Sequence, residues 1–269
     1  MNLNRVWAIF LRQWFLLKSN PIRLMNFLVW SVIGVFQWGF VSKYIDTFGA
    51  RSFNFTSVIL GALILWEFSS RLQQTIMTGF LEDVWSRNFV NFFASPLKIR
   101  EYLCGLILNS ITNGVANFVF ISLLAAIFFG YSILSLSLAI LPFVLVLFIF
   151  GLAMGILASA VVFRFGSAAE WLAWPLAGVL SIFSAVFYPV AALPNSLQVV
   201  AKLIPTSYVF ENLRASIFNN VGFSQMSHDL LIALALSLFY LLLVSWLFSS
   251  IYRRNLDKGG ITRFNTESF

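Results

Sequence analysis

The sequence alternates between long apolar runs and short polar segments, and six of the runs are long enough to cross a lipid bilayer. A helix needs about twenty apolar residues to cross the hydrocarbon core. Because no water is present there, such a run must satisfy its own backbone by forming a helix. We therefore expect an all-α membrane protein. The six predicted spans are Leu24–Val41, Phe55–Phe80, Leu103–Gly130, Leu136–Phe163, Trp171–Pro189 and Asp229–Tyr252.

Composition supports this class and excludes several kinds of site. Hydrophobic residues make up 60% and charged residues 10% of the chain, against about 25% charged residues in soluble domains. The single cysteine, Cys104, excludes an internal disulfide and a cysteine-rich metal site, and the single histidine, His228, excludes a histidine cluster. No phosphate-binding Gly-x-x-x-x-Gly-Lys-Ser/Thr loop is present, so this chain is not expected to bind ATP itself.

The positions of the basic residues predict the orientation. The net charge of +7 reflects loops on one side of the membrane and does not indicate nucleic-acid binding. Cytoplasmic loops of membrane proteins carry an excess of Lys and Arg, so both termini are expected in the cytoplasm. The basic residues on that side are Arg5, Arg12, Lys18, Arg23, Arg87, Lys98, Arg100, Arg164, Arg253, Arg254, Lys258 and Arg263.

Residues 1–22 precede the first span and have the pattern of an amphipathic helix. Arg12 and Lys18 interrupt the early apolar run, so no cleaved signal peptide is expected. Large apolar residues recur at helical spacing opposite Arg5 and Arg12, which predicts a helix lying in the headgroup region. These apolar residues are Trp7, Phe10, Leu11, Trp14 and Leu17.

The segment between the fifth and sixth spans, residues 190–220, contains prolines and polar residues although it lies between apolar runs. Pro194 and Pro205 are expected to start two short helices, because proline suits the first turn of a helix and breaks its interior. Neither helix is long enough to cross the bilayer. They are expected to re-enter the membrane or lie at its surface, and to form a vestibule or gate, because irregular backbone at membrane depth is tolerated around a watery cavity.

The same region resembles the signature of ABC type-2 exporter permeases. The matching stretch is FYPVAALPNSLQVVAKLIPTSYVFENLR, with a Tyr-Pro pair, a Leu-Pro pair, a further proline and a closing Glu-x-x-Arg. Its closing spacing departs in places from the commonest family pattern. The resemblance implies that this segment forms an outer gate on the extracellular side. The residues that the resemblance assigns to the gate are Tyr188, Pro189, Pro194, Pro205, Glu211 and Arg214.

The family resemblance also implies a set of partners. Members form a homodimer or a heterodimer with a similar permease, and bind two cytoplasmic ATPase subunits that hold ATP and Mg. The chain itself is expected to bind no cofactor or metal. We expect a bacterial inner-membrane exporter for lipid-linked glycans, lipids, drugs or peptides, in contact with membrane lipids. Residues 23–269 would form the six-span domain.

The loop after the second span, residues 82–94, resembles the cytoplasmic coupling helix of that family. Acidic residues suit its start, and Val84, Trp85, Phe89 and Phe92 recur at helical spacing. An ATPase could bind the apolar face of such a helix in a groove. The alternative is a connector that rests on lipid.

Glu67 and Arg71 are the only ionisable residues deep within a predicted span. They stand four residues apart with the acid first, which is the favoured order for an ion pair on one helix face. A charge at the bilayer centre costs roughly 2.5–3.5 kcal/mol, so such residues face protein or water. They form either a polar spot on the translocation path or dimer seam, or a self-satisfied pair that fixes a helix contact.

The fourth span carries a row of small residues, Gly151, Gly155 and Ser159. Small residues at this spacing let membrane helices approach closely, so we expect the row to be a packing surface.

Two other classes of protein remain open at this point. An intramembrane lipid- or sugar-modifying enzyme would need convergent acids, histidines or a metal site, and only Glu67 with Arg71 comes near this. An ATPase-independent channel or scaffold would leave residues 82–94 without a partner. The sequence does not identify the substrate, the ATPase, or the choice between homodimer and heterodimer.

Overall fold

The computed structural model describes residues 1–48, 55–133, 141–219 and 223–257. All regular structure in these residues is helical, as expected. In chain order the elements are α1 (Leu3–Ser19), α2 (Pro21–Phe48), α3 (Phe55–Trp85), α4 (Phe89–Ala94), α5 (Ile99–Phe129), α6 (Leu141–Phe165), η3 (Ser167–Ala169), α7 (Glu170–Ala173), α8 (Leu176–Phe183), η4 (Val190–Ala192), α9 (Asn195–Leu203), α10 (Pro205–Asn219) and α11 (Phe223–Asp257).

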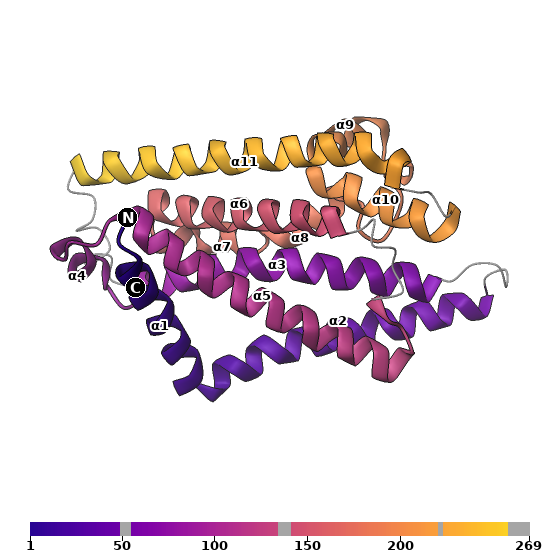
Figure 1. Cartoon of the computed structure of the whole chain (residues 1–269), viewed down its shortest axis with the longest axis horizontal. Helices are drawn as coiled ribbons and strands as arrows, with labels where there is room; N and C mark the ends of the chain where they lie inside the picture. The colour runs from indigo at the N-terminus through magenta and orange to yellow at the C-terminus, as the bar shows by residue number, and fades with distance from the viewer. Residues whose placement is uncertain (49–54, 134–140, 220–222, 258–269) are drawn as a thin grey trace.

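The helices form an elongated bundle around α3, with α6 beside it (Figure 1). The apolar core of α3 is 72% buried, whereas the corresponding part of α11 is 17% buried. This difference follows from position, because α3 packs against α2, α5 and α6, and α11 presents apolar residues such as Leu242 and Trp246 outward. In a membrane protein such exposed apolar side chains face lipid.

Two glycines allow α6 to lie close to α3. A Cβ atom at Gly151 would stand 2.7 Å from the backbone oxygen of Ser69, and one at Gly155 would stand 2.9 Å from Cβ of Ile76. The third small residue of the predicted row, Ser159, donates a hydrogen bond to the Gly155 carbonyl at 2.9 Å. The row therefore lies along the α3–α6 contact.

Five helices are long and apolar enough to cross a membrane, by length and composition. They correspond to the first, second, third, fourth and sixth predicted spans. The predicted fifth span, Trp171–Pro189, instead contains the end of α7, a turn at Trp174–Pro175 and then α8. Pro175 has no backbone N–H and its ring clashes with the preceding turn, so no continuous helix covers this run. The sequence analysis overlooked this proline.

Some expected boundaries lie outside the described residues. These are Leu136 at the start of the fourth span, Asn220 at the end of the segment between spans five and six, and the basic residues Lys258 and Arg263.

The chain returns to the same end of the bundle at which it begins. Figure 1 shows α1 and α4 at one end together with the last turns of α11, and α9 and α10 at the opposite end. Hydrogen bonds join the elements within each end. Trp85 Nε1 at the end of α3 donates to Glu170 of α7 at 3.0 Å, and Asn255 of α11 donates to the carbonyl of Phe163 in α6 at 2.9 Å. We call the two ends the α1–α4 end and the α9–α10 end.

Candidate functional site

The α9–α10 end is built from the proline-containing segment. Pro194 caps α9 and Pro205 is the first residue of α10, so both prolines start helices, as the sequence predicts. The hydroxyl of Ser207, in the first turn of α10, donates to the carbonyl of Ile204 at 2.6 Å. Tyr240 of α11 donates to the carbonyl of Leu203 at 3.2 Å. These contacts attach the short helices to one another and to α11.

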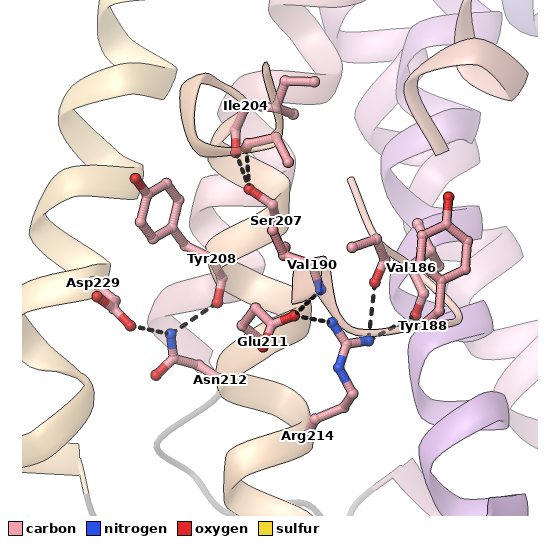
Figure 2. Close-up of polar contacts among 12 residues, drawn as sticks. Val186, Tyr188, Val190, Ile204, Ser207, Tyr208, Glu211, Asn212, Arg214 and Asp229 are labelled. Carbon is pink, nitrogen blue, oxygen red and sulfur yellow. Dashed lines mark hydrogen bonds and ion pairs between the residues drawn. The ribbon is translucent and has the colours of Figure 1, made fainter. Parts of the chain in front are cut away.

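Glu211 and Arg214 join α10 to the segment that precedes η4 (Figure 2). Arg214 Nη1 donates to the carbonyls of Ala185 and Val186, at 2.9 and 3.3 Å, and Nη2 donates to Glu211 Oε1 at 2.8 Å. The same carboxylate oxygen accepts the backbone N–H of Val190 at 2.7 Å. Arg214 is 9% exposed. The Glu-x-x-Arg pair therefore fixes the irregular backbone around Pro189, with Ala185 at a positive φ of 52°.

A second polar contact joins α10 to α11. Asn212 Nδ2 donates to the Tyr208 carbonyl at 2.8 Å and to Asp229 Oδ2 at 2.9 Å (Figure 2). Burial raises the pKa of the Tyr208 phenol, and the Asp229 carboxylate adds to this shift. The phenol therefore stays protonated and donates to the Lys202 carbonyl at 2.9 Å. All six residues of the expected gate lie at this end of the molecule.

At the α1–α4 end, residues 82–94 do not form one helix. Helix α3 continues to Trp85, a turn follows in which Arg87 has a φ of 53°, and α4 begins at Phe89. Val84 is 4% and Phe89 2% exposed. Phe89 packs against Phe80 and Phe163, with ring centroids 5.0 and 6.0 Å away. The face expected to meet an ATPase is thus turned largely inward.

Trp85 differs from the other residues of the predicted coupling segment. Its side chain is 44% exposed, while Phe92 is partly covered through contact with Tyr102 at 5.4 Å. Arg87 and Asn91 are exposed beside Trp85 in sequence. Helical spacing identifies which residues share a face, but it does not identify what covers that face.

A buried ionic cluster holds α1 against α3 and α5, and the sequence analysis did not find it. Asp83 is fully buried and forms a salt bridge with Arg12. Tyr102 donates to the other oxygen of the same carboxylate at 2.6 Å. The Arg12 guanidinium also lies 5.2 Å from the centroid of the Phe92 ring. The available signal was an acid directly after a predicted span, in a chain with ten acids.

Glu101 provides a second attachment for α1. Its carboxylate accepts the backbone N–H of Asn2 at 2.7 Å and lies 3.4 Å from Arg5, and it also caps α5 by accepting the N–H of Lys98 at 3.1 Å. Gly105 follows on α5, where a Cβ atom would meet Ile9 at 2.6 Å. Arg5 and Arg12 therefore face protein, while Trp7 and Trp14 on α1 are exposed.

Glu67 and Arg71 lie in the middle part of α3, and their opposite charges attract. Arg71 is 9% exposed, and its Nη2 donates to Ser31 of α2 at 3.0 Å. Ser31 in turn donates to Asn117 of α5 at 2.8 Å. Arg71 thus takes part in a polar contact that joins three helices.

Arg71 also lines a cavity of about 180 Å³ between α1, α2, α3 and α5. Most of its other lining side chains are amides and hydroxyls, and two are tryptophans. The lining residues are Gln13, Leu17, Trp30, Arg71, Gln74, Thr75, Thr78, Gly79, Asn109, Asn113 and Trp174. The described ranges contain no group of three or more His, Cys, Asp or Glu side chains placed to hold a metal ion.

These features define an integral membrane protein of the helical, multi-span class, with polar clusters at both ends of its bundle. The family model for ABC-2 type transporters matches residues 2–218, and the chain belongs to this family. It is therefore the membrane permease of an ABC transporter. A comparison with curated proteins found no match.

Proposed function

We propose that this chain is the permease subunit of an ATP-driven exporter in a bacterial inner membrane. Two copies, or one copy and a similar permease, would bind two ATPase subunits that hold ATP and Mg. The cargo would be an amphipathic molecule such as a lipid-linked glycan, a lipid or a drug. The observation that carries the proposal is the family match over residues 2–218, together with a chain whose two ends lie at the same end of the bundle.

Six membrane crossings follow if residues 170–189 cross as a broken segment. Five crossings would leave α1 and the end of α11 on opposite sides of the membrane, yet they lie at the same end (Figure 1). Glu170 contacts Trp85 at the α1–α4 end, and Val190 contacts Glu211 at the other end. The short helices α7 and α8 lie between these two contacts.

The basic residues favour the cytoplasm for the α1–α4 end. Arg5, Arg12, Arg87, Lys98 and Arg164 belong to it. Cytoplasmic segments carry this excess of positive charge. The α9–α10 end would then face outward, and its two short helices would form the re-entrant gate.

We place the ATPase contact on the exposed side of the α3–α4 turn. Trp85 is the exposed aromatic residue there, and Trp is enriched among residues that dominate binding energy at interfaces. Phe89 and Phe92 would transmit force inward, because they pack on Phe80 and Tyr102. Coupling would thus use an exposed contact and a buried aromatic cluster.

Co-purification with an ATPase encoded beside this chain tests the proposal. The variant Trp85→Asp with Asn91→Asp should weaken the complex about tenfold or more, because loss of an interface tryptophan costs about 2 kcal/mol or more. Both side chains are exposed, so the permease should remain folded and elute as wild type. Lys202→Asp, at the opposite end, is the matched control and should retain the ATPase.

Two results would contradict parts of this proposal. Wild-type affinity in the double variant would place the ATPase contact elsewhere on the surface. Failure of the wild-type chain to bind an ATPase under any nucleotide condition would remove the exporter assignment, and the channel and enzyme alternatives would return.

A further inference from the structure

The cavity beside Arg71 has a size and lining that restrict what it can hold. Its volume, about 180 Å³, is smaller than the roughly 300–1,000 Å³ of pockets that enclose drug-sized ligands. It therefore fits a single small headgroup. Trp30 and Trp174 at its wall are 67% and 44% exposed, so the cavity opens beside surfaces that face lipid. A lipid chain attached to the headgroup could remain outside.

Several polar groups in the lining have unused hydrogen-bonding capacity. The side chains of Gln74 and Thr78 make no hydrogen bond within the ranges that the structure describes. Asn113 Nδ2 donates to the carbonyl and side-chain oxygens of Asn109, at 2.8 and 2.9 Å. This leaves the Asn109 amide N–H groups and the Asn113 amide oxygen without a partner in the same ranges. The cavity thus offers both donors and acceptors.

The charge of the cavity favours a neutral ligand. Arg71 is the one charged residue in the lining, and Glu67, one helical turn away, attracts its guanidinium. An anionic headgroup would use donors alone and would face the amide oxygens unfavourably. A hydroxyl group both donates and accepts, which matches amide and threonine side chains. The two indoles supply flat apolar faces with a polar edge.

We propose that this cavity binds a neutral, polyhydroxylated headgroup about the size of one sugar ring, carried on a lipid that lies against α2 and α7. Gln74, Thr78, Asn109 and Asn113 bond its hydroxyl groups, and Trp30 and Trp174 cover the ring faces. The site lies within one protomer, between α1, α2, α3 and α5. The inference rests on the proposed export function, because it treats the ligand as cargo.

Native mass spectrometry of the purified full-length chain tests the inference. The probes are monoglucosyl diacylglycerol and phosphatidylglycerol with identical acyl chains. The wild-type chain should bind the glucosyl lipid more tightly. Gln74→Leu should weaken that binding about five- to tenfold, as loss of a hydrogen bond predicts, and leave phosphatidylglycerol binding unchanged. Because Gln74 has no hydrogen-bond partner in the described ranges, its replacement leaves no protein group unsatisfied.

Thr78→Val provides a second variant of nearly unchanged volume, and Gln225→Leu is the matched control. Gln225 is exposed on α11 and does not line the cavity, so this variant should bind as wild type. Equal affinity for the two lipids in the wild-type chain would overturn the proposal. Equal weakening by Gln74→Leu and Gln225→Leu would also overturn it.

The same samples separate this inference from the proposed function. Loss of glucosyl-lipid binding in Gln74→Leu, with the ATPase still co-purifying, supports a headgroup site in an intact transporter. Glucosyl-lipid selection that depends on Gln74 in a chain that binds no ATPase supports the site and removes the export assignment.

Discussion

Arg214 is the residue on which the irregular backbone at the α9–α10 end most depends. Its forked guanidinium bonds two carbonyls and one carboxylate at once. Lysine has a point charge and cannot reproduce this planar arrangement. Glu211 and Arg214 could be chosen from the sequence because they are three residues apart on one helix, whereas their partners in residues 185–190 could not.

We expect Arg214→Lys to lower the free energy of unfolding by about 1.5–3 kcal/mol, the range for hydrogen bonds to charged groups. The measurement is thermal unfolding of the purified protein in detergent. Lys202→Ala removes an exposed positive side chain nearby and should leave the Tm unchanged. A Tm for Arg214→Lys equal to that of Lys202→Ala would show that the fork is dispensable.

Asp83 shows what residue-level reading of the sequence misses. The acid and Arg12 are 71 positions apart, and no periodicity relates two helices that meet only after folding. Arg12 was assigned to the headgroup face of α1 because it lies opposite the tryptophans. The tryptophans do lie on the exposed side, and the arginine lies against protein. The amphipathic pattern was correctly identified, but its polar face contacts a protein surface.

At the scale of elements, attachment of α1 should depend on the buried carboxylate. Breaking a buried ion pair costs about 3–5 kcal/mol because one charge is left unpaired. Asp83→Asn should therefore raise hydrogen exchange throughout Leu3–Ser19, while exchange in α10, at the opposite end, stays constant. Unchanged protection of α1 would mean that Glu101 and the Gly105 contact suffice to hold it.

The α3–α6 contact should tolerate no added atom at Gly155. A Cβ there would lie 2.9 Å from Ile76 and 3.1 Å from the Gln73 carbonyl, so Gly155→Ala should destabilise the protein by about 1–3 kcal/mol. Gly178 on α8 has nothing within 4 Å, and Gly178→Ala should be neutral or stabilise by up to about 1 kcal/mol. Thermal unfolding compares the two. Equal Tm values would contradict the close packing.

Element positions were predictable wherever a single local rule decided them. Apolar length located five long helices, and Pro194 and Pro205 located the starts of α9 and α10. The fifth span was treated as continuous because its hydropathy masks Pro175. The inward direction of Phe89 was not predictable, because it depends on Phe163, far away in the chain.

At the scale of the whole molecule, orientation can be measured with cysteine labelling. In a Cys104→Ser background, Lys202→Cys should react with a membrane-impermeant maleimide in intact cells, because α9 is proposed to face outward. Asn91→Cys on α4 should react only after the cells are permeabilised. Both positions are exposed. The reverse pattern would invert the topology and move the proposed ATPase contact out of the cytoplasm.

The global arrangement was predictable only in outline. Charge placement and apolar length indicate an all-helical membrane protein with its ends on one side, and the family match agrees with the resemblance around Glu211. The cavity could not be predicted, because Gln13, Trp30, Gln74 and Asn113 come from four helices. Each is an ordinary polar or aromatic residue on its own, and only their convergence forms a site.

The attachment of α1 also has a consequence for biogenesis. The helix leaves the ribosome first, yet Asn2 bonds to Glu101, 99 positions later in the chain. Its permanent partners do not exist until α3 and the start of α5 have been synthesised. During that interval α1 must wait on the membrane surface, held by the tryptophans that stay exposed in the final fold. The first helix to be made is thus among the last to dock.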